Sequence, residues 1–203
     1  AYTLMNKIVP LADVGVDFHT GGANRNYPHI RCDFNEPANL ELARAFSPPY
    51  IMNSRLRDSS FRKAAHKAGK TILVFEGGES HRFDELAVTE AMDGIMRLMK
   101  HLGMAGREPS KINNTRELSS TVWIRAGLAG LFRAYVDYGQ AVKKNQVIAS
   151  VTDPFGETES LIRCRVSGYV LGLRSLPVVN RGDALINIGL EEKAKKPPKL
   201  KAV

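Results

Sequence analysis

An α/β domain followed by a smaller all-β module is the architecture that this 203-residue sequence predicts. Up to about residue 105, apolar runs typical of buried strands are interspersed with stretches in which apolar residues recur at helical spacing. From residue 121 to 190 the chain changes to short strand-like runs separated by glycines and turn dipeptides. Residues 106–120 are polar and aperiodic, which indicates a linker between a domain at 1–105 and a module at 121–190.

The first domain contains two predicted buried strands, at residues 13–18 and 71–75, and three predicted helices. One helix is expected to be capped by Asn35, with a proline in its first turn, and a second fits residues 60–68. Asp84 is expected to cap the third. The third helix carries an apolar stripe that predicts core packing, made of Val88, Ala91, Met92, Ile95, Leu98, Met99 and Leu102. The polar residues 22–31 are expected to form a loop.

Composition is that of an ordinary soluble globular protein, with 43% hydrophobic and 25% charged residues. The longest apolar runs fall far short of the roughly 20 residues of a membrane-spanning helix, and the sequence has no signal-peptide layout. We therefore expect a cytoplasmic protein with no membrane partner. Cys32 and Cys164 lie far apart, which predicts buried free thiols rather than a disulfide or a cysteine zinc site.

A net charge of +8 invites a nucleic-acid hypothesis. Five of these charges, however, are lysines of the tail at residues 191–203, and without them the remaining +3 is unremarkable. The tail has no apolar periodicity and is predicted to be a basic disordered end. We expect no nucleic-acid partner, and the sequence leaves homo-oligomerisation open.

Residues suited to catalysis follow both predicted strands, at the edge of the sheet where ligands bind in open α/β folds. The first strand ends at His19, with Asp17 two positions earlier and glycines after it. A neutral imidazole ligates zinc well, although a strand-end histidine is more often structural. The second strand ends at Glu76, with Glu79 three positions later. A carboxylate in that place can act as a general base on metal-bound water.

These residues carry a resemblance to a known family. The segment Asp17-Phe18-His19-Thr20-Gly21 is followed by asparagine, arginine, proline, histidine and arginine, and later by Glu76-Gly77-Gly78. The combination resembles the succinylglutamate desuccinylase/aspartoacylase family over residues 1–190. It implies a zinc-carboxypeptidase-like mixed sheet with helices, and a zinc-dependent deacylase that hydrolyses the amide bond of an N-acyl amino acid or a similar small acyl substrate.

The same resemblance assigns a role to each candidate residue. It makes His19 the third ligand of one zinc ion and Glu76 the base that activates the zinc water and later protonates the leaving amine. Asp17 and Glu79 would support the site from behind these two groups. Because arginine binds carboxylates in a bidentate manner, Arg62 and Arg25 are candidates for holding the substrate, although an arginine on a helix is usually a solvated surface residue.

The resemblance also implies two earlier zinc ligands, a histidine and a glutamate three residues apart. None of the five histidines of the chain has a glutamate three residues on, and His81 is followed at that spacing by Asp84, the expected helix cap. Catalytic zinc needs three protein ligands. We therefore expect the other ligands to come from a missing N-terminal segment or a partner chain, and this chain alone to be an inactive fragment with an incomplete sheet.

The module at 121–190 resembles the barrel-sandwich hybrid of biotinyl and lipoyl carriers. Carrier function requires a lysine at a hairpin tip, and the matching turns at residues 153–156 and 166–168 contain none. We expect a structural or gating module. For the whole chain, the alternative to an enzyme is a non-catalytic binding or scaffold protein that keeps the fold without the metal.

Overall fold

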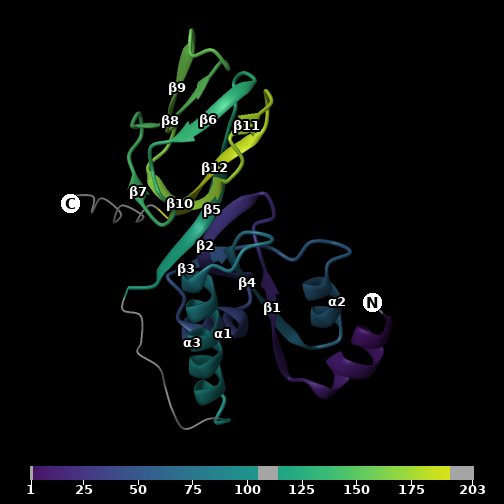
Figure 1. Ribbon diagram of the computed structural model, residues 1–203. Coiled ribbons are helices and arrows are strands. Elements are labelled where there is room, and N and C mark those ends of the chain that lie inside the picture. The colour runs from purple at the N-terminus through teal and green to yellow at the C-terminus, as the bar shows by residue number, and fades with distance from the viewer. Residues whose placement is uncertain (1, 105–113, 193–203) are drawn as a thin grey trace, which may run out of the picture.

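The computed structural model describes residues 2–104 and 114–192 (Figure 1). In chain order the elements are η1 (Leu4–Ile8), η2 (Val9–Leu11), β1 (Val14–His19), β2 (Asn24–Cys32), α1 (Pro37–Phe46), β3 (Tyr50–Asn53), α2 (Phe61–Lys67), β4 (Thr71–Gly78), α3 (Glu85–His101), β5 (Arg116–Arg125), β6 (Gly130–Ala134), β7 (Ala141–Val142), β8 (Val147–Thr152), β9 (Glu159–Arg163), β10 (Gly168–Arg174), β11 (Val178–Val179) and β12 (Ala184–Glu191). The architecture is a mixed α/β domain followed by an all-β module, as the sequence predicts.

An eight-stranded sheet runs through both parts of the chain, in the order β1-β4-β2-β3-β5-β12-β10-β7. Its first part is mixed, because β4 is parallel to β1 but antiparallel to β2. Helices α1 and α3 pack together against the first part, while α2 contacts β4 (Figure 1). The core between these helices and the sheet is built from Ile30, Cys32, Ala43, Phe46, Ile51, Leu73, Phe75 and Leu98.

Four expected elements of the α/β domain are confirmed. Strands β1 and β4 cover the predicted apolar runs, and helix α2 begins after Ser60, whose hydroxyl accepts a hydrogen bond from the Lys63 amide. Helix α3 begins after Asp84, whose carboxylate accepts from the Ala87 amide at 3.2 Å. The first helix also forms, but Glu36 and not Asn35 is its N-cap residue. Asn35 instead donates to a carboxylate oxygen of Asp33, which folds the turn before the helix.

The predicted loop at residues 22–31 is wrong. Most of it is β2, a strand hydrogen-bonded on both sides, to β4 and β3, and also to β10. Strand β2 has no apolar alternation, because several of its polar side chains face other polar side chains rather than the core. A prediction based on apolar periodicity therefore does not find it. Strand β3 was not expected either, since its four residues follow two prolines and are too few to show a period.

The apolar stripe of α3 is only partly core. Leu98 is buried, but Val88, Met92 and Leu102 are 42%, 66% and 42% exposed. The helix is rotated from the expected orientation because it approaches α1 through Gly94, which lies directly against the ring of Phe46. A glycine there lets the helices come closer than any side chain would allow.

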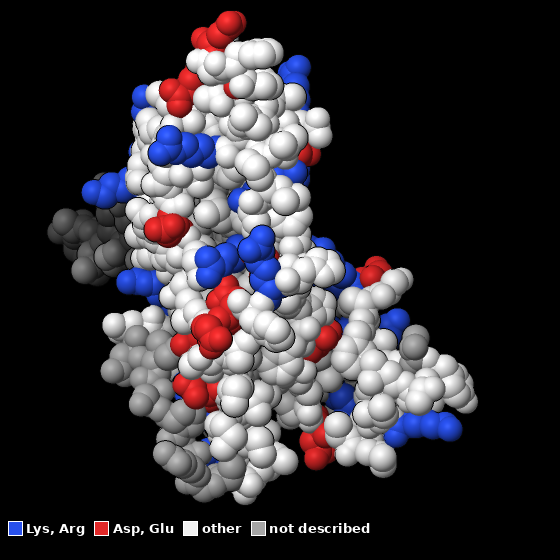
Figure 2. Space-filling model, in the orientation of Figure 1, with Lys and Arg blue, Asp and Glu red and all other residues white. Residues whose placement is uncertain are grey.

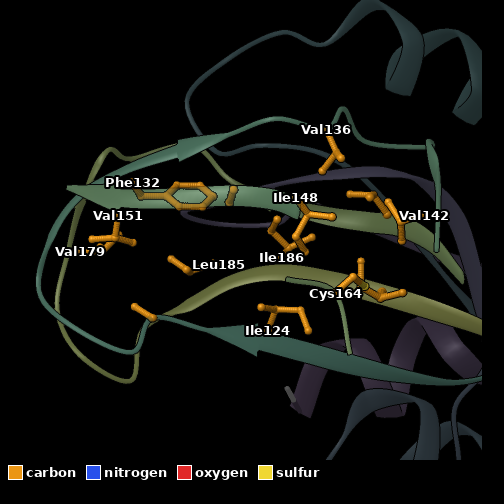
Figure 3. Close-up of a cluster of buried hydrophobic side chains, with 14 residues drawn as sticks. Ile124, Phe132, Val136, Val142, Ile148, Val151, Cys164, Val179, Leu185 and Ile186 are labelled. Carbon is orange, nitrogen blue, oxygen red and sulfur yellow. The ribbon is translucent and has the colours of Figure 1, made fainter. Parts of the chain in front are cut away.

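In the second part, the four-stranded sheet β11-β6-β8-β9 packs over the far end of the large sheet. Side chains from both sheets meet in a closed apolar core (Figure 3), which includes Ile124, Phe132, Ile148, Cys164 and Ile186. The expected all-β character is confirmed, and both cysteines are buried free thiols. Residues 116–120, assigned to the linker from sequence, form the first half of β5, and residues 105–113 lie outside the described residues.

Four tyrosines join the two parts. Tyr27 packs on Tyr50 and Tyr138 with ring centroids 5.6 and 5.4 Å apart, and Tyr50 packs on Tyr169 at 5.4 Å. The Tyr50 hydroxyl donates to the carbonyl of Gly139, and burial raises the pKa of Tyr50 to about 12. Aromatic pairs of this geometry add about 1 kcal/mol each beyond their buried area, so the module is fixed to the α/β domain.

Acidic and basic side chains are interspersed on the face shown in Figure 2. None of the helices in residues 2–104 and 114–192 combines the length and apolarity needed to cross a lipid bilayer. The tail predicted at residues 191–203 lies almost entirely outside the described residues; Glu191 is the last residue of β12.

The contact between α3 and α1 at Gly94 leads to a prediction about stability. In a free helix Gly→Ala is stabilising by roughly 1 kcal/mol, but a Cβ on Gly94 would lie 1.9 Å from Cε1 of Phe46. We expect Gly94→Ala to lower the free energy of unfolding by about 1–3 kcal/mol, the usual cost of overpacking, measured by urea denaturation. Gly127→Ala is the control, because a Cβ there meets nothing within 4 Å. A more stable Gly94→Ala protein would show that the helices are not in this contact.

A second prediction concerns His29, which is 4% exposed and whose Nδ1 donates to the Tyr27 carbonyl at 2.8 Å. Burial lowers the pKa of His29 from its ordinary value of 6.5. The unfolded chain therefore binds a proton more readily than the folded protein, and stability is lost as pH falls through 6.5 and below. We expect His29→Asn to flatten this loss between pH 7.5 and 5.5 in denaturation curves, whereas His66→Asn, at an exposed position, leaves it unchanged. Parallel curves for both variants would contradict the assignment.

Candidate active site

The two strand ends predicted to carry the chemistry lie side by side. Strands β1 and β4 are parallel neighbours, and His19 is the direct register partner of Glu76. Partners in adjacent strands project from the same face of a sheet, and parallel strands end at the same edge. Residues 57 positions apart in the chain are therefore presented together at one edge of the sheet, where a ligand can reach them.

His19 has a free ring nitrogen beside this position. Its side chain is 48% exposed, and Nε2 lies 2.9 Å from Oδ2 of Asp17, two residues earlier on the same face of β1. A carboxylate accepts only from a protonated nitrogen, so this contact places the proton on Nε2 and leaves the Nδ1 lone pair available. A carboxylate that orients a histidine in this way is the usual support of a zinc ligand.

Glu76 is buried and held at both oxygens. It is 7% exposed, and its Oε1 accepts from Nη1 of Arg31 at 2.9 Å while its Oε2 accepts from Nδ2 of Asn26 at 3.3 Å. A bulge in β2 between Asn26 and His29 changes the register and lets both donors reach one carboxylate. Neither donor was predicted as a partner of Glu76, although Arg31 belongs to the motif that carries the family resemblance and Asn26 lies within the same segment.

Arg62 projects from α2 toward the same region, but its guanidinium is already hydrogen-bonded to other residues of the protein. Its side chain is buried, and it donates to the carbonyl of Ser54 at 3.1 Å, the Ser54 hydroxyl at 3.1 Å and the carbonyl of Arg55 at 3.3 Å. Burial first and the charge of Arg31 second lower the pKa of Arg62. This arrangement fixes the chain between β3 and α2, and binding of substrate by Arg62 stays a prediction.

Arg25 is tied to two elements. Its Nε donates to Oδ2 of Asp84 at 2.8 Å, and its guanidinium lies 4.1 Å from the ring centroid of Tyr138 in the β module. The side chain is still 43% exposed, so part of the guanidinium faces solvent. Asp84 serves twice, as the cap of α3 and as the partner of Arg25.

Glu79 lies beyond the two glycines and pairs with Arg82 at 3.0 Å. Both residues line a hollow of about 300 Å³ between the end of β1 and the start of α3. Most of its wall is apolar, with Phe18, Phe75 and Phe83 among the lining residues, and His19 lies at its edge. Glu79 is thus close to the candidate site without being hydrogen-bonded to Glu76.

A complete metal site is not present in the part of the chain that the structure describes. Residues 2–104 and 114–192 contain no group of three or more histidine, cysteine, aspartate or glutamate side chains that is placed to hold a metal ion. The described residues fit one ligand position, that of His19 supported by Asp17. Any zinc site built here needs ligands from elsewhere.

Comparison with known proteins agrees with this geometry. The family model described as the succinylglutamate desuccinylase/aspartoacylase catalytic domain matches residues 1–102. An N-alpha-acetyl-L-2,4-diaminobutyric acid deacetylase from Halomonas elongata is 29% identical over 194 residues, which are 88% of this chain and 56% of the relative. The chain thus spans little more than half the length of this deacetylase.

Solved structures share the fold. A succinylglutamate desuccinylase from a Silicibacter species superposes with a TM-score of 0.82 at 25% identity, over 95% of this chain and 62% of the other. The ectoine utilization protein EutE (DoeB) from Ruegeria pomeroyi, in a product-bound structure, gives a TM-score of 0.81 at 23% identity, over 94% and 61%. From the family model, which covers half of the sequence, the chain belongs to the succinylglutamate desuccinylase/aspartoacylase family.

Proposed function

We propose that this chain supplies His19 and Glu76 to the active site of a zinc-dependent deacylase that hydrolyses the amide bond of an N-acyl amino acid or a similar small acyl compound. The observation that carries the proposal is the register pairing of these residues at the ends of two parallel strands. Membership of a family whose named relatives include a deacetylase and a desuccinylase supports the reaction class.

Each residue has a separate task in this proposal. When bound, zinc supplies a Lewis acid and an acidified water. His19 offers Nδ1 as one ligand, while Asp17 holds the ring through Nε2. Glu76 takes the proton of the attacking water and delivers it to the leaving amine, as a general base and then a general acid. Arg31 and Asn26 fix the direction of its carboxylate before the substrate arrives.

The solvent exposure of the two candidate arginines indicates which of them can bind the substrate. The relatives' names describe acyl derivatives of amino acids, which carry a free carboxylate. Arg25 has part of its guanidinium free for such a group, whereas the three hydrogen bonds of Arg62 to Ser54 and Arg55 leave it less able to turn toward a ligand. We therefore place Arg25 ahead of Arg62 as the carboxylate-binding residue.

The remaining zinc ligands are proposed to come from polypeptide that docks beside β1, as an N-terminal segment or a partner chain. Strand β1 is the last strand of the eight-stranded sheet, so one of its hydrogen-bonding edges is open within the described residues. Phe18 on β1 and Val88 on α3 line the same hollow and are 49% and 42% exposed, and Met92, one turn further along α3, is 66% exposed. An apolar surface beside an open strand edge suits an added strand and helix, which would bring ligands toward His19.

The β module is proposed to have a barrel-sandwich-like form and a structural or gating role, and the protein to work in the cytoplasm. Two buried free thiols and the absence of disulfides among the described residues agree with a reducing compartment. The two turns in which a carrier lysine is expected contain none, which favours a structural role over a carrier role.

The catalytic assignment predicts a matched pair of variants. Glu76→Gln keeps an acceptor for Arg31 but removes the base, so we expect kcat for N-acyl amino acids to fall by roughly 10²–10⁴-fold with the protein still folded. Glu79→Gln, three residues away and paired with Arg82, should stay within a few-fold of the parent. Steady-state assays of the complete zinc-loaded enzyme, which includes the polypeptide that supplies the remaining ligands, measure both. A binding or scaffold protein would instead show no hydrolysis and unchanged ligand affinity in Glu76→Gln.

Zinc binding is tested at the histidine and its supporting carboxylate. We expect His19→Ala to lose zinc, and Asp17→Asn to weaken zinc binding by about 10–100-fold because the ring is no longer oriented. His66→Ala, an exposed histidine remote from the sheet edge, is the control. Competition with a chelator dye gives the affinities of the complete enzyme, in which the remaining ligands are present. Equal zinc affinity in all three variants would remove His19 from the metal site.

A further inference from the structure

The Asn26 side chain occupies a slot between two glycines from distant parts of the chain. A Cβ on Gly172, in strand β10 of the module, would lie 2.8 Å from Oδ1 of Asn26. A Cβ on Gly21, in the turn after His19, would lie 3.0 Å from Cγ of Asn26. The first distance would force Oδ1 to move and the second is tight, while a Cβ on Gly21 would also lie 2.1 Å from the carbonyl oxygen of Asn24, so the Asn26 side chain lies between two positions that favour glycine.

Strand pairing places this slot between the two parts of the protein. Asn26 is the register partner of Gly172 on β10 and, on its other side, of Gly78 on β4. The strand β10 belongs to the module, whereas β4 carries Glu76. Asn26 is therefore the point at which a strand of the module lies beside the strand that bears the candidate base.

The slot also fixes which way the Asn26 amide faces. Oδ1 lies toward Gly172, and Nδ2 donates to Oε2 of Glu76 at 3.3 Å. In the opposite orientation an amide oxygen would face a carboxylate oxygen, which is repulsive. A close approach by the module thus goes together with a hydrogen bond to the carboxylate that performs the proposed chemistry.

We infer that Asn26 is a positioning residue for Glu76 and that the β module acts on the reaction through Gly172. This inference rests on the proposed deacylase function and gives the module a role that requires neither a carrier lysine nor contact with the substrate. Asn26 would not touch the substrate. It would hold one oxygen of the Glu76 carboxylate and so keep the carboxylate in a single orientation.

The variant Gly172→Ala isolates this effect. After Asn26, the atoms nearest to the added Cβ would be Cβ of Asn187 at 3.4 Å and the ring of Trp123 at 3.7 Å, which are ordinary contacts. The fold is therefore expected to tolerate the methyl group while the Asn26 amide moves away. We expect kcat to fall about tenfold, the loss of one hydrogen bond to a charged group, with KM nearly unchanged.

A double-mutant cycle gives the readout that a purely structural role would not move. Asn26→Ala should lower kcat about as much as Gly172→Ala, and adding Gly172→Ala to Asn26→Ala should lower it no further, because the methyl group then has nothing to displace. Gly127→Ala, a module glycine with nothing within 4 Å of its Cβ, should leave kcat unchanged.

A spectroscopic measurement separates this inference from the proposed function. In ¹H–¹⁵N spectra the Asn26 side-chain amide signals should shift in Gly172→Ala and stay in place in Gly127→Ala. Unmoved signals in Gly172→Ala overturn the contact whether or not the protein is active. Shifted signals with parental kcat, or additive losses in the double variant, overturn the positioning role. Absence of deacylase activity in the complete enzyme, assayed with the polypeptide that supplies the remaining zinc ligands, overturns the proposed function and the catalytic part of this inference together, while the signals still decide the contact.

Discussion

The parallel pairing of β1 with β4, in one particular register, is the constraint on which the candidate site depends. Six consecutive pairs run from Val14 with Thr71 to His19 with Glu76. Because side chains alternate between faces, a shift by one residue would place the imidazole and the carboxylate on opposite sides of the sheet. Phe18 and Phe75, whose ring centroids are 5.5 Å apart on the opposite face, make such a shift costly.

Strand β2 connects the pair β1 and β4 to the rest of the sheet. It is antiparallel to β4, parallel to β3 and antiparallel to β10, so it belongs to both parts of the protein. Its half-buried Asn26 and Arg31 both donate to the Glu76 carboxylate, which the bulge between Asn26 and His29 brings within reach of both. These hydrogen bonds account for the presence of polar side chains on a strand inside the sheet.

The sequence was sufficient where a local rule determines the structure. Ser60 and Asp84 predict the starts of α2 and α3 because capping depends on one side chain and the amides that follow it. The strand ends at His19 and Glu76, and the family, could likewise be predicted from contiguous motifs. Strand β2 could not, because its stability comes from partners up to 150 residues away, such as Arg174 opposite Asn24.

The same limit applies to the site. That Glu76 is held by Arg31 follows from a bulge whose position no periodicity reveals. The rotation of α3, which exposes Met92, follows from the contact of Gly94 with Phe46 and so depends on the packing of two helices. The candidate pair His19 and Glu76 could thus be predicted from the sequence, whereas the side chains that hold Glu76 became visible only in the fold.

Charge in the site favours the proposed class of substrate. Arg31 and Arg62 share the Ser54 hydroxyl as an acceptor, and the charge of Arg31 contributes to the lowered pKa of Arg62. Two guanidiniums that share one acceptor make a positive region, which Glu76 and the buried Asp33 balance in part. Nε of Arg31 is buried and has no hydrogen-bond partner among the described residues. A site with this surplus of cationic donors is better suited to an anionic ligand, such as an acylated amino acid, than to a neutral or cationic one.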